Sequence, residues 1–152
     1  MVSLRHIGVT VTDMDRSLEL YQKHFGLEVV WDQIEAGPFI DSLSGIEDIK
    51  VRTVKMKDKL GGMIELLQYH SHPEENEENS RNKIIKIGCS HLAVTVNDVD
   101  EAYKELSALG LKFNCTPQLS PDGGAKVCFC RDYDGTLIEI VVVSDIPIHP
   151  LA

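Results

Sequence analysis

The sequence is poor in cysteine motifs, in long apolar runs and in positive charge. It has four cysteines, none of them in a C-x-x-C pair: Cys89, Cys115, Cys128 and Cys130. This spacing argues against a dense disulfide framework, and we expect reduced thiols in a cytoplasmic protein. No apolar run approaches the roughly 20 residues that a membrane-spanning helix needs. The N-terminus lacks the pattern of a secretory signal, so we expect none.

Basic residues are outnumbered by acidic ones. The chain has 15 Lys and Arg against 24 Asp and Glu, for a net charge of −9. This balance argues against a nucleic acid or an anionic membrane as partner, because both require a basic face. It leaves room for a small anionic ligand, since a few lysines can set the local potential. A length of 152 residues with 43% hydrophobic residues fits a single domain with a buried core.

One ten-residue phrase occurs twice in the chain. It reads "HIGVTVTDMD" from His6 and "HLAVTVNDVD" from His91, and six of the ten positions are identical. Apolar residues alternate with small or polar ones in both copies, which predicts a strand. The aspartates that follow are typical of helix N-termini. Each predicted helix ends at a glycine, Gly26 or Gly110, as helix C-termini prefer.

Both copies also end alike. A short strand follows each helix, "LEVVWD" at 27–32 or "LKFNCT" at 111–116, and then two strands are joined by a hairpin signal, Gly61-Gly62 or Asp134-Gly135. Each half therefore reads strand, helix, strand, strand, strand, which predicts an α+β fold. We expect one domain over 1–152 in four parts. They are a first module at about 3–69, a polar linker at about 70–86, a second module at about 87–143 and a tail at 144–152.

The last strand of each copy carries one carboxylate between apolar residues, in Ile64-Glu65-Leu66 and Ile138-Glu139-Ile140. Period two places each glutamate on the face opposite its apolar neighbours. A carboxylate on an inner sheet face is costly unless it is paired or binds a cation. The repeat thus supplies two histidines and two glutamates, which converge if the modules pack with pseudo-twofold symmetry. We predict a metal site made of His6, Glu65, His91 and Glu139.

Four phrases carry a resemblance to a known family: "HIGVTVTDMDRSLELYQKHFGLEV", "MIELLQY", "HLAVTVNDVDEAYKELSALGLKF" and "RDYDGTLIEIV". Over roughly 3–143, the chain resembles the vicinal oxygen chelate superfamily, which includes glyoxalase I, methylmalonyl-CoA epimerase, extradiol dioxygenases and drug-resistance proteins. The resemblance implies two tandem βαβββ modules whose curved mixed sheets form a metal-binding cup. It also places His6, Glu65, His91 and Glu139 where glyoxalase I-like members hold their metal.

The resemblance implies a metal-dependent isomerase (epimerase) or lyase that stabilises the enolate of a small carbonyl substrate. The nitrogen and oxygen ligands suit Co²⁺, Ni²⁺, Zn²⁺, Mn²⁺ or Mg²⁺, and the sequence does not rank these ions. Glutamates of the metal site serve as bases in related enzymes, which points to Glu139 or Glu65. Epimerases add an acid from the loop before the third strand, where Glu47 and Asp48 are weaker candidates.

We expect a methylmalonyl-CoA epimerase-like enzyme acting on an acyl-CoA or a similar carbonyl acid. The first alternative is a glyoxalase I-like lactoylglutathione lyase acting on a thiol adduct. Against it, Thr10 and Tyr69 stand where that enzyme has its glutathione-binding arginine and an asparagine. The second alternative is a non-enzymatic binding or resistance protein, which the complete ligand set disfavours.

Two further residues are weaker candidates for substrate binding. Lys126 follows the loop "SPDGGA" and could contact an anionic group, while Tyr69, like Trp31, either lines the site or fills the core. Because family members often complete their cups by pairing, we also expect a homodimer.

Overall fold

The computed structural model describes residues 2–72, 84–85 and 87–143. The chain divides into two compact units, residues 1–77 and 78–152. No helix in the described ranges is long and apolar enough to cross a membrane.

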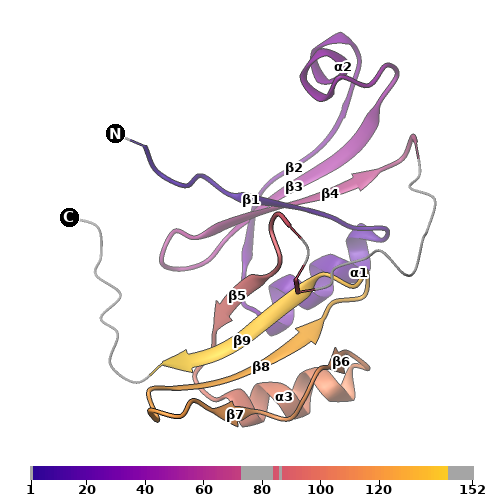
Figure 1. Cartoon of the computed structure of the whole chain (residues 1–152). Helices are drawn as coiled ribbons and strands as arrows, with labels where there is room; N and C mark the ends of the chain where they lie inside the picture. The colour runs from indigo at the N-terminus through magenta and orange to yellow at the C-terminus, as the bar shows by residue number, and fades with distance from the viewer. Residues whose placement is uncertain (1, 73–83, 86, 144–152) are drawn as a thin grey trace. The chain divides into compact units, whose positions relative to one another are not determined.

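The first unit contains a four-stranded mixed sheet (Figure 1). The strands lie in the order β1-β4-β3-β2, with β1 parallel to β4 and the other pairs antiparallel. In chain order its elements are β1 (Ile7–Thr10), α1 (Met14–Leu18), the π-helical segment η1 (Glu19–His24), β2 (Glu28–Ala36), α2 (Pro38–Ser44), β3 (Lys50–Lys57) and β4 (Met63–Tyr69).

The second unit repeats this plan around a five-stranded sheet. The order is β5-β9-β8-β6, with β5 parallel to β9, and the short strand β7 also pairs with β8. Its elements are β5 (Leu92–Thr95), α3 (Val99–Ala108), β6 (Lys112–Phe113), β7 (Gln118–Leu119), β8 (Ala125–Arg131) and β9 (Leu137–Val143). The predicted α+β class with two mixed sheets is confirmed.

The predicted helix signals act as expected. Asp13 accepts a hydrogen bond from the Arg16 amide at 3.0 Å, and Asp98 accepts from the amides of Asp100 and Glu101 at 2.8 and 3.0 Å. These bonds satisfy backbone donors that a helix leaves free at its start. They also hold the pKa of Asp98 below its ordinary value, with the Glu101 amide as the largest cause.

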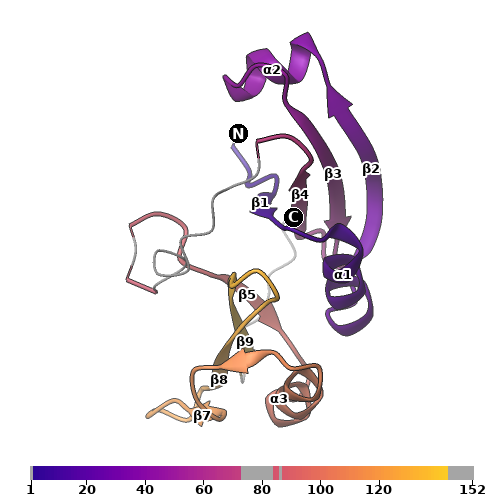
Figure 2. The ribbon, with the colours of Figure 1, turned by 90° about the vertical axis from the view of Figure 1, so that its right-hand side faces the viewer.

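Three local features differ from the prediction. Helix α2 was not predicted; it follows β2 (Figure 2) and begins at Pro38, directly after Gly37. The strand predicted at 27–32 begins at Glu28 and extends to Ala36. The segment "LKFNCT" pairs with β8 only at Lys112–Phe113, and pairing resumes at Gln118–Leu119 after Pro117, which has no backbone N–H to donate.

Each sheet has one apolar face and one face that carries polar groups. In the first unit, the apolar face holds Val54, Met56 and Leu66, all fully buried. In the second unit, Cys128, Cys130, Ile138 and Ile140 are buried in the same way, and α3 packs against β8 and β9. Because side chains alternate along a strand, Glu65 and Glu139 project from the opposite faces.

Candidate metal centre

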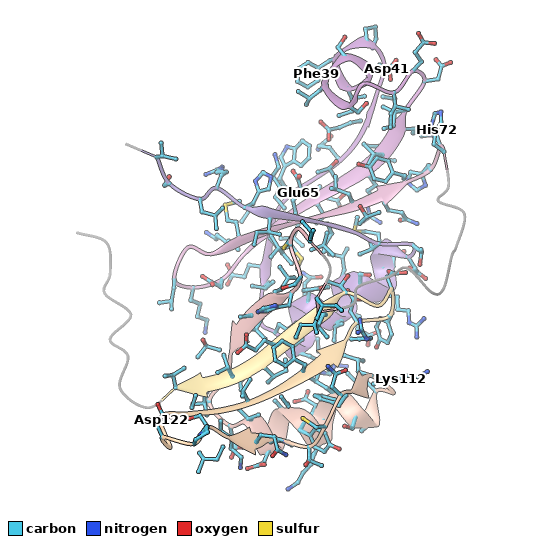
Figure 3. The ribbon with its side chains drawn as sticks, viewed as in Figure 1. Phe39, Asp41, Glu65, His72, Lys112 and Asp122 are labelled. Carbon is cyan, nitrogen blue, oxygen red and sulfur yellow. The ribbon has the colours of Figure 1, made fainter. Side chains whose placement is uncertain are left out.

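His6 and Glu65 form a pair on the polar face of the first sheet. Parallel pairing of β1 with β4 sets Gly8 opposite Glu65, two residues beyond His6. The Nε2 atom of His6 lies 3.3 Å from Oε2 of Glu65, and their side chains are 29% and 16% exposed. Figure 3 shows Glu65 within this sheet. The fold therefore brings together two residues that are far apart in the sequence.

His91 and Glu139 form the matching pair in the second unit. Ala93 is the strand partner of Glu139, just as Gly8 is the partner of Glu65. The Nε2 atom of His91 lies 3.2 Å from Oε2 of Glu139. The repeated sequence has thus produced the same register, the same pair of atoms and nearly the same separation in both units.

The separation within each pair is compatible with two ligands of one metal ion and also with a direct ion pair between the two groups. A direct charge-assisted hydrogen bond between these groups would be about 2.7–2.9 Å long. Two donor atoms, each about 2.1 Å from an ion and at right angles, lie roughly 3 Å apart. The other ring nitrogen of His6, Nδ1, is buried, and no hydrogen-bond partner for it is found among the described residues. An imidazole nitrogen and a carboxylate oxygen are donors that suit a divalent cation. Among the described residues, no group of three or more His, Cys, Asp or Glu side chains lies close enough together to hold a metal ion.

His91 has a positioning contact that His6 lacks. Its Nδ1 atom lies 2.8 Å from the Ser90 hydroxyl, and its ring packs edge-on against Phe129 with centroids 5.3 Å apart. Holding one ring nitrogen fixes the orientation of the other toward a ligand. The Ser90 hydroxyl therefore directs Nε2 of His91 toward Glu139.

Lys55 is a charged neighbour of Glu65 in the first unit. The sequence analysis did not predict this contact. Lys55 is the cross-strand partner of Glu65, and its Nζ atom lies 3.6 Å from Glu65 Oε1 and 4.6 Å from the centroid of the Trp31 ring. A β-bulge between Val29 and Trp31 shifts the register, so that Trp31 becomes the partner of Lys55. Without the bulge, period two would have placed Trp31 on the other face of the sheet.

The weaker candidates are spread more widely. Glu47 and Asp48 lie exposed in the loop between α2 and β3, and no described hydrogen bond or ion pair joins either to the His6–Glu65 pair. Tyr69 lies on the same face of β4 as Glu65 but four residues away. Lys126 forms an ion pair with Asp100 of α3 and projects from the face of β8 opposite Phe129. The structure therefore does not bring Lys126 to the His91–Glu139 pair.

The buried cysteines have no catalytic character. Burial raises the pKa of Cys128 to about 11 and that of Cys130 to about 12. Both groups remain thiols at neutral pH, and thiols are poor nucleophiles and poor metal ligands.

Comparison with known proteins gives one family match. The family model described as the Glyoxalase/Bleomycin resistance protein/Dioxygenase superfamily matches residues 3–140. Uncharacterized protein YraH of Bacillus subtilis is 28% identical over 141 residues, covering 91% of this chain and 97% of that protein. The 2-epi-5-epi-valiolone epimerase of an Actinomyces species is 28% identical over 80% of this chain and 67% of its own length.

A third relative is longer than this chain. The lactoylglutathione lyase of Schizosaccharomyces pombe is 28% identical over 93% of this chain, but the match spans only 48% of the lyase. Among solved structures, a glyoxalase family protein from Bacillus cereus aligns with a TM-score of 0.82 at 18% identity, covering 93% of each chain. The fosfomycin resistance protein FosX of Listeria monocytogenes, crystallised with Mn(II) and sulfate, aligns with a TM-score of 0.61 at 16% identity, covering 95% of this chain and 94% of FosX.

Proposed function

Since this chain belongs to the glyoxalase/bleomycin resistance protein/dioxygenase superfamily, we propose that it is a metal-dependent enzyme that removes a proton next to the carbonyl group of a small substrate. The observation that carries the proposal is the repeated pair: His6 faces Glu65 and His91 faces Glu139 in the same strand register. In this proposal, the two units are modules of one domain, and the two pairs hold a single divalent ion.

The residues present suit such an ion. His6, Glu65, His91 and Glu139 would hold the ion through two imidazoles and two carboxylates, and the ion would remain open to substrate oxygens. When bound, the ion polarises a carbonyl oxygen and stabilises the negative charge that develops as the neighbouring carbon loses its proton. The structure of FosX with Mn(II) supports a divalent ion on this fold. Co²⁺, Ni²⁺, Zn²⁺ and Mg²⁺ are equally compatible with the donor atoms.

In the proposed reaction, a glutamate side chain of the protein removes the proton from the substrate. A general base must reach the proton that it removes, so it has to move within its site. Glu65 faces both His6 and Lys55 and is 16% exposed, whereas Glu139 faces His91 alone among the charged groups described and is 25% exposed. Glu139 is therefore less restrained, and we assign it as the base.

We place the substrate nearer to that of an epimerase than to that of a lactoylglutathione lyase. Thr10 lies exposed on β1, on the same face as Gly8 and Glu65, where the glutathione-binding arginine of glyoxalase I would stand. A threonine cannot form the ion pair that an arginine forms with a glutathione carboxylate. The epimerase from Actinomyces and the lactoylglutathione lyase from Schizosaccharomyces pombe are each 28% identical to this chain, so the choice rests on Thr10 and not on the relatives.

Exchange of the substrate α-proton with solvent deuterium tests the proposed function. The purified protein is loaded with each ion and incubated in D₂O with methylmalonyl-CoA or with a glutathione hemithioacetal, and exchange is followed by NMR. We expect metal-dependent exchange with methylmalonyl-CoA or a related carbonyl acid. Exchange with the hemithioacetal alone would favour the lyase. Failure with every ion and with a wider set of carbonyl acids would overturn the enzyme proposal and favour a binding protein.

We also propose a homodimer in solution. The chain has a mass of 17.0 kDa, so multi-angle light scattering at micromolar concentration distinguishes the two states directly. A particle of twice the chain mass is expected, and a monomer alone would contradict this proposal.

A further inference from the structure

Lys55 is a half-buried cation next to one of the two proposed metal-binding pairs. Its side chain is 32% exposed, and the 3.6 Å between Nζ and Glu65 Oε1 is too long for a hydrogen bond. A lysine ammonium has three N–H donors, and no acceptor within hydrogen-bonding distance of Nζ is found among the described residues. We propose that Lys55 binds an anionic group of the substrate. The substrate class is then a small carbonyl compound that carries a carboxylate, phosphonate or phosphate group.

This inference rests on the proposed function, and the local geometry supports it. Glu65 Oε2 faces His6, and Glu65 Oε1 faces Lys55. The cation therefore lies directly beside one of the proposed metal ligands, Glu65. A substrate whose oxygens reach the ion could place a neighbouring negative charge against the ammonium, where a charge-assisted hydrogen bond would form.

The Lys55 side chain is held in place before any ligand arrives. Its ammonium lies over the Trp31 ring, 4.6 Å from the centroid, where a cation is attracted by the electrons of the ring face. The bulge in β2 puts Trp31 opposite Lys55. A preorganised lysine loses less side-chain entropy on binding than a free surface lysine does.

The need to neutralise the charge of Glu65 does not by itself explain why a lysine stands at position 55. The equivalent glutamate in the second unit, Glu139, has Phe129 rather than a cation as its partner on the neighbouring strand. The second His–Glu pair is thus built without a lysine. A separate role for Lys55 toward a ligand accounts for this difference between two otherwise matching units.

Two hydroxamate probes test the inference. Acetohydroxamate chelates metals through two neighbouring oxygens, and succinomonohydroxamate adds a carboxylate to the same chelating group. Binding of each probe to the metal-loaded protein is measured by titration calorimetry. Wild type should bind the carboxylate-bearing probe roughly tenfold to a hundredfold more tightly, the range of one hydrogen bond to a charged group. Lys55→Met should lose that preference and keep its affinity for acetohydroxamate, whereas Lys55→Arg should retain the preference.

Lys50→Met is the matched control. Lys50 lies at the exposed start of the same strand β3, on the opposite face by alternation, and its loss changes the net charge equally. The control should keep the wild-type preference. Three outcomes would overturn the role of Lys55 and leave the proposed function standing. They are equal affinity for both probes in wild type, an unchanged preference in Lys55→Met, and a lost preference in Lys50→Met. Failure of the wild-type protein to take up any metal would overturn the proposed function and this inference together.

Discussion

Lys55 and Phe129 occupy the same position in the two units: each is the cross-strand partner of the glutamate that faces a histidine. Lys55 places a positive charge beside Glu65, whereas the Phe129 ring packs against His91, and no lysine or arginine of the described residues forms an ion pair with Glu139. The two proposed metal-binding pairs are therefore equal in residue type and different in surroundings. This difference is the basis for assigning different roles to the two glutamates.

Glu139→Gln should separate proton transfer from metal binding. The amide keeps an oxygen that can bind the ion but cannot accept a proton at neutral pH. We expect the rate of α-proton exchange to fall by roughly a hundredfold or more, while one ion per chain is still taken up. The matched variant Glu65→Gln should lower exchange only as far as it lowers metal affinity. Comparable exchange in Glu139→Gln and wild type at saturating metal would rule out Glu139 as the base.

Ser90→Ala should weaken metal binding without touching a metal ligand. The Ser90 hydroxyl lies 2.8 Å from Nδ1 of His91 and holds the ring in place. Loss of such a partner typically costs about 10- to 100-fold in metal affinity. Competition with a chromogenic chelator measures the change. Ser107→Ala, on the exposed side of α3, is the control and should bind metal as wild type does. An unchanged affinity in Ser90→Ala would remove the positioning role.

Arg52 should contribute stability that disappears in acid. Its guanidinium donates to Asp32 at 3.0 and 2.8 Å and to Asp15 at 2.9 Å. The hydrogen bond from Arg52 holds the pKa of Asp32 below its ordinary value of 3.8. A carboxyl group with a lowered pKa stabilises the fold above that ordinary value, and the stabilisation is lost as the pH falls through the lowered pKa.

We therefore expect Arg52→Met to lower the free energy of unfolding at neutral pH by about 0.5–1 kcal/mol, a small value because Asp32 is partly exposed. The difference from wild type should shrink as the pH falls below about 4. Urea unfolding at a series of pH values measures it. A difference that stays constant down to pH 2 would show that the lost arginine packing, rather than the ion pairs, caused the effect.

The sequence was a good guide to features that are repeated. Two copies of one phrase, each with its cap and glycine, were enough to predict the shared order of strand, helix, strand, strand and strand, to which the structure adds α2 in the first unit and β7 in the second. The alternation around Glu65 and Glu139 correctly placed both carboxylates opposite the apolar faces. Repetition helps because each copy confirms the interpretation of the other.

The features that the sequence analysis missed belong to only one copy or depend on strand pairing. Helix α2 has no counterpart among the described residues of the second unit, although Pro38 after Gly37 is a helix-start signal that could have indicated it. The importance of Lys55 depends on its register with Glu65, and the position of Trp31 depends on a bulge. Neither can be obtained from the period of one strand, because both are set by which residues pair across the sheet.

The most direct test of the central claim is the number of ions that each chain binds when either His–Glu pair is removed. Wild type, His6→Ala/Glu65→Ala and His91→Ala/Glu139→Ala are loaded with metal, dialysed and analysed for metal and protein content. His24→Ala/Glu19→Ala, which removes the same residue types from η1, is the control. We predict one ion per chain in wild type and control, and loss of tight binding in both pair variants. Two ions per chain in wild type, or full occupancy after removal of either pair, would contradict a single site built from His6, Glu65, His91 and Glu139.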